Sequence, residues 1–353
     1  MRVLILALVA AGICAQPEAL GQVFRTTVNV VVAPVTVEDG DGAYVHGLQP
    51  HEFRLTDNGA IQDIKVDVSY IPISLVVAVQ ANADTEAVRP KIQKIHAMLA
   101  PLVTGDQGEI AVVAFDHRID VLQDFTTDGD LIAKAFEKIG KRSGSSTSAL
   151  NDAVRASIRM LSRRPADRRR VLLIIGEARD KGSESKAKDV MIDAQLQNVL
   201  IESVNISRLL TTLTRKPDPP RPDPIPPTAR PQPAGVPPTA AATGTYSGGV
   251  NFMPLFVEIF KQTKAIFVDN PLEVYTKYTG GREHSFTTQA GLENAISRIG
   301  EELHNQYIVT YNPNNKADGG FHEIKVEVIR NGKIRGDYKI VTRPGYWMAS
   351  VGG

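Results

Sequence analysis

The segment from Ser74 to Gln80 (Ser-Leu-Val-Val-Ala-Val-Gln) is a short apolar run that ends abruptly in small polar residues over 81–85. A strand that is buried on both faces has this continuous apolar character, whereas a half-exposed strand alternates between polar and apolar residues. Open α/β sheets place their ligands beside the loops that follow the carboxyl ends of such strands. The run therefore predicts a buried parallel strand followed by a candidate binding loop.

The alternation of apolar strands with helical patterns continues along residues 71–207 and resumes after residue 250. Repeated strand–helix units predict an α/β fold with a doubly wound, mostly parallel, Rossmann-like sheet and right-handed crossovers. The predicted strands cover residues 71–80, 108–115, 119–125, 171–175, 200–206 and 280–286, and the predicted helices cover residues 88–102, 130–139, 149–161, 185–199, 252–261, 272–278 and 292–303.

The two ends of the chain alternate with a period of two instead. Val28, Val30 and Val32 alternate in the first of these segments, and Asp57-Asn-Gly59 is a strong hairpin signal there. The second segment, over 306–347, carries Asn331-Gly332 at a similar turn. Neither segment is large enough to be stable alone. We expect the N- and C-terminal segments to pair into one small antiparallel β sandwich.

Residues 1–21 are typical of a signal peptide, with Arg2 before an apolar stretch from Val3 to Ile13. That stretch is too short to span a bilayer, and no later one is long and apolar enough. We therefore expect export to the periplasm or the extracellular space, with no membrane span in the mature chain. The single cysteine, Cys14, lies in the leader. Removal of the leader would leave no thiol for disulfides, catalysis or metal binding.

Half of the 22 prolines fall between Pro217 and Pro238. A segment of this composition cannot bury enough apolar surface to order itself, so we predict a disordered insertion over 208–250 within the α/β domain. The predicted organisation is a signal peptide over 1–21, an N-terminal β segment over 22–70, an α/β domain over 71–310 and a C-terminal β segment over 311–353.

Charge and motif content argue against nucleic-acid binding and against catalysis. The formal net charge is +1, and the arginines over 163–170 are interpreted as a solvated loop. A Gly-x-Ser-x-Gly motif is absent, and the seven histidines fit no zinc-ligand spacing. Asp116 and His117 follow a predicted strand, and we interpret them as a surface ion pair. The sequence thus predicts a protein that is not an enzyme.

Three stretches resemble the von Willebrand factor A domain family. They are the first strand with its loop over 75–85, the segment Gly144–Ala153, and the apolar strand Leu172–Gly176. The resemblance covers about 71–310. The layout, with a Gly-Ala-Tyr-Val-His-Gly-Leu stretch at Gly42–Leu48, is similar to a secreted, acidobacterial-type subgroup of VWFA-related proteins. This resemblance implies a protein-binding role at the carboxyl edge of the sheet.

The resemblance also implies a divalent ion, which the family holds with an Asp and two Ser of the first loop, a Thr of the second and an Asp of the third. In this chain the corresponding residues are Gln80, Asn82, Asp84, Ser148 and Ile175. Hard divalent cations prefer several anionic oxygen ligands, which this set lacks. We therefore predict a degenerate site with no metal cofactor. The polar first loop would instead cap the following helix through Asp84 or Thr85.

The sequence thus favours an exported, non-catalytic protein–protein interaction module. The candidate residues for the partner-binding rim are Gln80, Asn82, Asp84, Asp116, Ser148 and Glu177. One alternative is a metal-dependent adhesin, in which Asn82, Asp84 and Ser148 hold Mg²⁺ or Ca²⁺ together with waters. Another is a structural envelope component that docks through the sandwich or the proline-rich segment.

Overall fold

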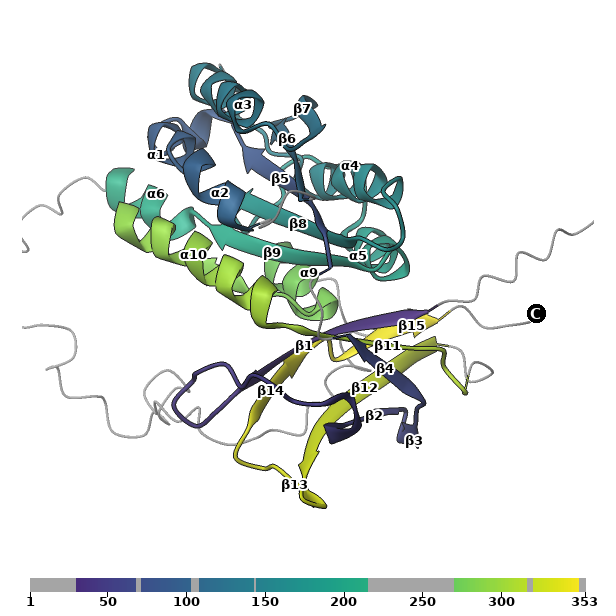
Figure 1. Cartoon of the computed structure of the whole chain (residues 1–353). Helices are drawn as coiled ribbons and strands as arrows, with labels where there is room; N and C mark the ends of the chain where they lie inside the picture. Colours follow the sequence, from purple (N-terminus) through teal and green to yellow (C-terminus); the bar gives the residue numbers. More distant parts are fainter. Residues whose placement is uncertain are drawn as a thin grey trace, which may run out of the picture.

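The computed structural model describes residues 30–67, 71–102, 108–142, 144–214, 270–315 and 320–348. The predicted signal peptide, the proline-rich stretch from residue 215 and the helix predicted over 252–261 lie outside these described residues. The described residues form an α/β domain and a β sandwich that pack against each other (Figure 1). Residues 208–214, predicted to be disordered, belong to a helix because Leu209 and Leu210 are buried in the core.

A six-stranded sheet is the centre of the α/β domain. Its strand order is β10-β9-β8-β5-β6-β7, and every neighbouring pair is parallel except β6 with β7. This arrangement confirms the predicted doubly wound, mostly parallel sheet. The strands are β5 (Ile73–Gln80), β6 (Glu109–Phe115), β7 (Ile119–Thr126), β8 (Arg169–Gly176), β9 (Val199–Asn205) and β10 (Glu283–Ser285).

Helices cover both faces of this sheet. Alternate residues of β5 point to opposite faces: Leu75 and Val77 lie in one apolar cluster, whereas Val76 and Ala78 lie in the other. The first cluster also contains side chains of α1, α2, α3, α6 and α10, and the second contains side chains of α4, α5 and α9. The helices are α1 (Arg89–Gln93), α2 (His96–Leu102), α3 (Gly129–Lys141), α4 (Leu150–Ser162), α5 (Ala187–Leu196), α6 (Ser207–Thr214), α9 (Pro271–Thr279) and α10 (Gln289–Asn305).

The two terminal segments form the predicted antiparallel sandwich. One sheet has the order β14-β1-β11-β4; the other has the order β13-β12-β2-β3, with β15 also paired to β12. The predicted domain boundary at 310/311 falls within β11, so this strand belongs to the sandwich. The strands are β1 (Val31–Glu38), β2 (Phe53–Asp57), β3 (Ala60–Ile61), β4 (Ile64–Asp67), β11 (Tyr307–Tyr311), β12 (Gly320–Arg330), β13 (Lys333–Ile334), β14 (Lys339–Thr342) and β15 (Gly345–Met348).

Both predicted hairpin turns are confirmed. Asn58 and Gly59 have φ values of 48° and 81°, and they connect β2 to β3. Asn331 and Gly332 have φ values of 53° and 71°, and they connect β12 to β13. Two consecutive residues with positive φ form the turn that matches the twist of an antiparallel hairpin, and Asn-Gly is the pair that tolerates it best.

A buried carboxylate joins the two sheets of the sandwich. Asp57 at the end of β2 accepts hydrogen bonds from Tyr311 Oη at 2.9 Å and Tyr346 Oη at 2.7 Å. The Nδ1 atom of His322 lies 2.7 Å from Asp57 Oδ1, and Asn315 Nδ2 donates to the same oxygen at 3.2 Å. Asp57 and His322 are both fully buried. A single side chain thus links β2, β11, β12 and β15.

Charged side chains fill the junction between the α/β domain and the sandwich. Arg282, just before β10, donates from Nε to Glu302 Oε1 at 2.9 Å and also pairs with Glu38 of β1. Lys339 Nζ donates to Glu38 Oε2 at 2.7 Å. Glu202 on β9 accepts from the backbone N–H of Arg282 at 2.9 Å. Burial raises the pKa of both Glu202 and Glu302, so this junction contains two carboxyl groups that ionise with difficulty.

The arginines over 163–170 form the predicted solvated loop only in part, because Arg163 is exposed but other arginines bind neighbouring strands. Arg164 donates from Nε and Nη2 to the carboxylate of Glu109 at 2.7 and 2.6 Å. Arg168 Nε donates to Ser74 Oγ at 2.7 Å, and Arg170 donates to two backbone carbonyls. These guanidinium groups connect the start of β8 to β5 and β6. The prediction was wrong for these three side chains because it considered only the charge of this segment and not the acceptors on neighbouring strands.

Candidate functional site

The carboxyl ends of β5 and β8 lie side by side in the middle of the sheet, where Val79 pairs with Ile175. From β5 the chain crosses to β6 over one face, and from β8 it crosses to β9 over the other face. The loops after β5 and β8 therefore diverge, which is the arrangement that opens a ligand crevice in doubly wound sheets. The candidate site is built from these two loops, the end of β6, and the loop before α4.

An amide group joins the loops after β5 and β8. Gln80 Oε1 accepts from the backbone N–H of Glu177 at 2.7 Å, and Gln80 Nε2 donates to Glu177 Oε2 at 2.9 Å. The same Nε2 donates to Asn82 Oδ1 at 3.0 Å. Gln80 and Asn82 are fully buried. Both the oxygen and the nitrogen of the Gln80 side-chain amide are thus hydrogen-bonded within the protein.

Lys181, which is not among the residues predicted from sequence, lies at the entrance to this network. Lys181 Nζ is 2.8 Å from Asp84 Oδ2 and 3.5 Å from Glu177 Oε2. The hydrogen bond to Asp84 raises the pKa of Lys181 above its ordinary value, and the charge of Glu177 adds to this effect against partial burial. Asn82 Nδ2 also donates to Asp84 Oδ2, at 3.3 Å. The ammonium group therefore neutralises charge on both loops.

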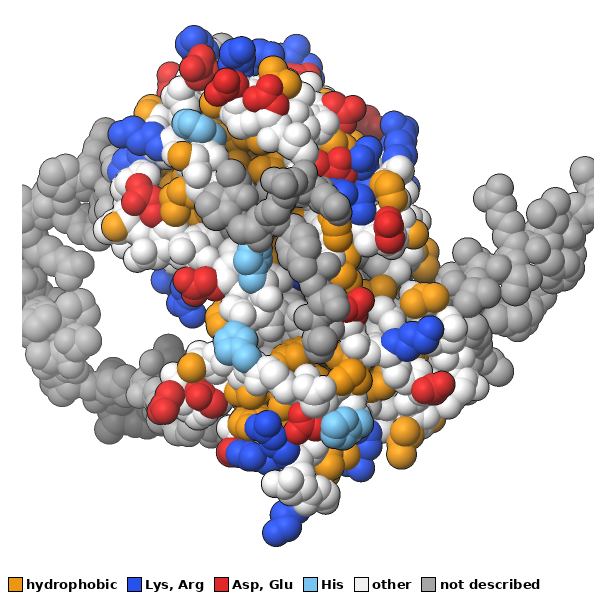
Figure 2. Space-filling model, viewed as in Figure 1, with side chains coloured by type: hydrophobic (Ala, Val, Ile, Leu, Met, Phe, Trp, Pro, Cys, Tyr) orange, Lys and Arg blue, Asp and Glu red, His pale blue; other side chains and the backbone are white. Residues whose placement is uncertain are grey.

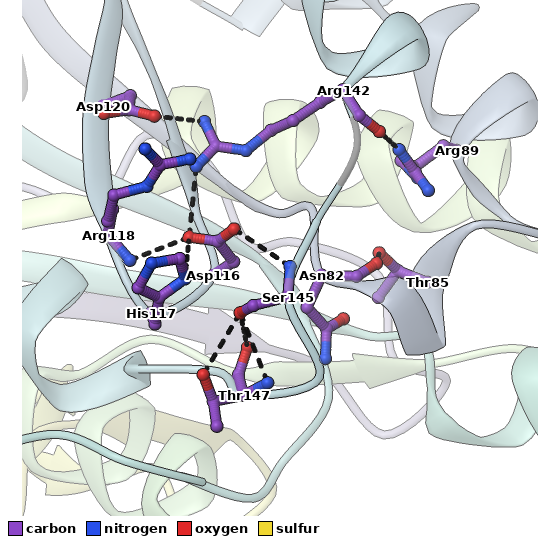
Figure 3. A network of polar contacts seen from close by, with 10 residues as sticks. All are labelled: Asn82, Thr85, Arg89, Asp116, His117, Arg118, Asp120, Arg142, Ser145 and Thr147. Carbon is purple, nitrogen blue, oxygen red and sulfur yellow. Dashed lines mark hydrogen bonds and ion pairs between the residues drawn. The ribbon is translucent and has the colours of Figure 1, made fainter.

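Asp116, at the end of β6, holds the loop before α4 in place (Figure 3). Its carboxylate accepts from the backbone N–H groups of Arg118 at 2.7 Å and Ser145 at 3.2 Å, and from Arg142 Nη2 at 3.2 Å. Burial would raise the pKa of Asp116, but these hydrogen bonds and the charge of Arg142 lower it below its ordinary value. His117 Nδ1 lies 3.2 Å away. The predicted surface ion pair is wrong for Asp116, which is fully buried in this network.

The loop over 144–148 packs directly on the backbone that follows β5. Ser145 O accepts from the N–H of Ala83 at 2.7 Å, and a Cβ at Gly144 would overlap the backbone of the loop beneath it. Ser148 exchanges two backbone hydrogen bonds with Lys181, at 3.3 and 2.8 Å. Ser148 Oγ is buried and has no hydrogen-bond partner among the described residues. The loop over 144–148 is thereby fixed against the loop after β5 and the loop after β8.

The structure brings the six candidate rim residues to one edge of the sheet, but it does not expose them equally. The side chains of Asp84 and Glu177 are 44% and 19% exposed. Four others are fully buried, namely Gln80, Asn82, Asp116 and Ser148. A partner at this edge can therefore contact Asp84, Glu177 and Lys181 directly, whereas the buried residues position the loops.

The predicted helix cap is also wrong. Thr85 Oγ1 donates to the backbone carbonyls of Gln80 and Asn82, at 3.2 and 2.9 Å, and Asp84 is held by Lys181. Helix α1 begins after Val88 with no side-chain cap. The polar residues of the loop after β5 therefore contact the loop after β8, which contains Glu177 and Lys181.

The side chains at this edge do not fit a divalent cation. The amide oxygens of Gln80 and Asn82 already accept hydrogen bonds, and the carboxylate of Asp84 is paired with Lys181. A divalent ion requires several free oxygen ligands, and it is repelled by an ammonium group a few ångströms away. Across the described ranges, no three His, Cys, Asp or Glu side chains lie close enough together to hold a metal.

A pocket of about 780 Å³ opens beside the Asp84–Lys181 ion pair. Asp84, Glu86, Glu177 and Lys181 contribute its charged lining, and small and apolar side chains including Leu210 contribute the rest. The Lys181 side chain is 40% exposed and that of Glu86 is 81% exposed. This edge thus offers hydrogen-bonding and ionic contacts beside an apolar wall.

Figure 2 shows acidic and basic side chains intermixed on one face of the molecule, in line with the balanced composition. Among the helices that the structure describes, none is long and apolar enough to cross a membrane.

No protein-family model and no curated protein matches the sequence. Solved structures are similar at low identity. BatB from Bacteroides thetaiotaomicron is 12% identical over 38% of this chain and 66% of that chain, with a TM-score of 0.30. An aerotolerance-related membrane protein from Bacteroides fragilis is 10% identical over 65% of this chain and 99% of that chain, with a TM-score of 0.38. The vWF domain of the pili tip protein Mfa5 from Porphyromonas gingivalis is 12% identical over 32% of this chain and 40% of that chain, with a TM-score of 0.26. The chain thus spans less than two thirds of the length of the BatB and Mfa5 structures.

Proposed function

We propose that this chain is an exported, non-catalytic protein-binding module of the von Willebrand factor A type, and that it works in the periplasm or outside the cell. Its partner, a protein, would dock on the carboxyl edge of the sheet. The observation that carries this proposal is the partly exposed ion pair of Lys181 with Asp84 beside a pocket at the divergence of two loops. The assignment to the secreted, acidobacterial-type subgroup stays a prediction.

The rigidity of the edge supports recognition. The loops after β5, β6 and β8 and the loop before α4 are joined by partly buried hydrogen bonds through Gln80 and Asp116, so little conformational entropy would be lost on binding. The buried hydroxyl of Ser148 has no hydrogen-bond partner among the described residues, so no base is hydrogen-bonded to it there. The charged groups that remain exposed are suited to orienting a partner.

Asp84→Ala is expected to weaken capture of the partner by about 30-fold or more, because losing one member of a charge pair that a partner buries costs about 2 kcal/mol or more. The change in folding stability should stay below about 1 kcal/mol, since this ion pair is partly exposed. A pull-down from envelope extract identifies the partner, and titration with the purified partner gives the affinities.

Asp337→Ala is the matched control, because Asp337 forms an exposed ion pair with Arg335 on the sandwich, away from this edge. Equal capture by the wild type, the Asp84 variant and the Asp337 variant would contradict the proposal. Deleting 215–250, which leaves α6 intact, separates the structural alternative: loss of capture in this deletion, with Asp84→Ala unaffected, would assign binding to the proline-rich segment.

We further propose that the site works without a metal ion. Calorimetric titration of the full chain with MgCl₂ and with CaCl₂ should give no saturable heat, and EDTA should leave partner capture unchanged. Lys181 supplies positive charge to Asp84 and Glu177, which is the role that a cation would have there. Micromolar binding of either ion that disappears in Asp84→Ala would instead support the metal-dependent adhesin with Asn82, Asp84 and Ser148 as ligands.

A further inference from the structure

A second pocket, of about 420 Å³, lies at the opposite side of the α/β domain, where α5 and β8 meet the sandwich. Its apolar lining includes Leu196, Trp347 and Met348. Its charged lining consists of Arg170 and Arg343, and none of the described lining residues is Asp or Glu. Lys188 Nζ lies 5.5 Å from the centroid of the Trp347 ring and adds a third positive charge nearby.

Arg343 is an unusual residue to find in this position. It is 3% exposed, and its Nε has no hydrogen-bond partner among the described residues. Its guanidinium lies 5.3 Å from the centroid of the Tyr346 ring, a cation–π contact. Burial lowers the pKa of Arg343 to about 10, against the charges of nearby groups including Asp57, so the side chain stays charged at neutral pH. A buried charge without a hydrogen-bonded anion is costly.

Arg170 differs because backbone carbonyls accept from two of its nitrogens, although its Nε, like that of Arg343, has no hydrogen-bond partner among the described residues. It donates from Nη1 to Gln197 O at 3.0 Å and from Nη2 to Arg164 O at 2.8 Å. These bonds fix the Arg170 guanidinium, but they supply no full negative charge. Two guanidinium groups therefore line a pocket whose described walls are otherwise uncharged.

We propose that this pocket binds a small amphiphile with an oxyanion head group, a carboxylate or a phosphate monoester, on an apolar body. The head group would accept hydrogen bonds from Arg343, because a planar guanidinium is suited to bidentate contact with such oxygens. The apolar body would pack on Trp347 and Leu196. The volume suits a small ligand and is at the lower end of the range for ligand pockets.

Trp347 is the single tryptophan of the chain, so its fluorescence reports directly on this pocket. The full chain would be titrated with 3-phenylpropionate, phenyl phosphate, the neutral 3-phenylpropionamide and inorganic phosphate. We expect a saturable change in emission with one or both of the aromatic anions, and binding at least about tenfold weaker for the amide. The stronger of the two anions identifies the head group.

Arg343→Met should weaken binding of the anion at least about tenfold while leaving the amide unaffected. Leu196→Glu is a second variant that should also weaken binding of the anion, because it puts a negative charge at the pocket. Leu196 is 50% exposed, so this replacement does not disturb the core. Val121→Glu is the matched control, since Val121 is 52% exposed on β7 at the far edge of the sheet. No saturable response to any probe, equal binding of anion and amide, or inorganic phosphate binding as tightly as the aromatic anions would overturn the proposal.

Discussion

Asp57→Ala is expected to lower the free energy of unfolding of the sandwich by roughly 3–5 kcal/mol. The substitution removes one carboxylate but strands several buried groups: the hydroxyl groups of Tyr311 and Tyr346 and the imidazole of His322. Asn315 Nδ2 keeps its hydrogen bond to the backbone carbonyl of residue 57. Each buried donor left without a partner costs about 1–3 kcal/mol. Urea denaturation followed by tyrosine and tryptophan fluorescence measures the loss.

Asp57→Asn separates the hydrogen bonds from the charge. Asparagine keeps one acceptor oxygen, so this variant should lose less stability than Asp57→Ala. Asp337→Ala provides the control for removal of an acidic side chain, since its ion pair with Arg335 is exposed and its loss should change stability little. Unfolding curves for Asp57→Ala that overlay those of the wild type would show that the buried carboxylate does not hold the two sheets together.

The sequence contained a usable signal for the position of Asp57. Phe53, Leu55 and Asp57 are spaced two residues apart, which places all three on one face of the strand. Phe53 and Leu55 are buried, and Asp57 is buried beside them. The hairpin Asp57-Asn-Gly59 was predicted correctly, but assigning the aspartate only to the turn concealed its inward direction. Its four partners come from other strands or from the segment after β11, and one sequence does not indicate their proximity.

The alternation of strands and helices was predictable because each strand and helix carries its own hydrophobic period. The same logic placed the candidate rim residues at one edge, since the carboxyl ends of parallel strands meet there. The burial of four of them, Gln80, Asn82, Asp116 and Ser148, was not predictable. It depends on the loop over 144–148 packing on the backbone near Ala83, and this packing requires Gly144 at a position with no room for a Cβ.

Lys181 could not be assigned to the site from sequence, because residues 177–186 have no regular period that fixes side-chain directions. The spacing of Glu177 and Lys181 by four residues was the one local signal, yet such a pair is expected to be in contact on a helix and this segment is not helical. The contact arises because Ser148 and Lys181 pair through their backbones. The loop after β8 is thus held by a backbone bridge between two segments that are distant in sequence.

The junction between the α/β domain and the sandwich was likewise beyond sequence analysis, because its charges come from distant segments. Glu202 and Glu302 are both nearly fully buried, and Arg282 lies between them and the sandwich. Burial first, and the charge of Glu302 second, raises the pKa of Glu202 well above its ordinary value. The stability of the chain should therefore depend on pH through this junction.

The sign follows from proton linkage. Because folding raises the pKa of Glu202, the folded chain binds this proton more strongly than the unfolded chain does. The contribution of Glu202 to stability is fully present below its ordinary pKa of 4.5 and is lost as the pH rises through the folded-state value. Each unit of pKa elevation is worth about 1.4 kcal/mol. Glu202→Gln cannot ionise, so its stability relative to the wild type should increase as the pH rises from 4.5.

The difference between the two unfolding curves is the quantity to measure, in a His284→Gln background, because His284 Nε2 lies 4.0 Å from Glu202 Oε2 and replacing Glu202 changes its surroundings. Burial lowers the pKa of His284 from 6.5 to about 4, so in the natural chain acidification through this window destabilises the fold. Glu302→Gln should repeat the effect of Glu202→Gln in weaker form, since Arg282 partly neutralises that carboxylate. Glu301→Gln, on the exposed face of α10, is the matched control and should leave the pH profile unchanged. A constant difference between Glu202→Gln and the wild type from pH 4.5 to 8 would mean that Glu202 is not held in its neutral form by the fold.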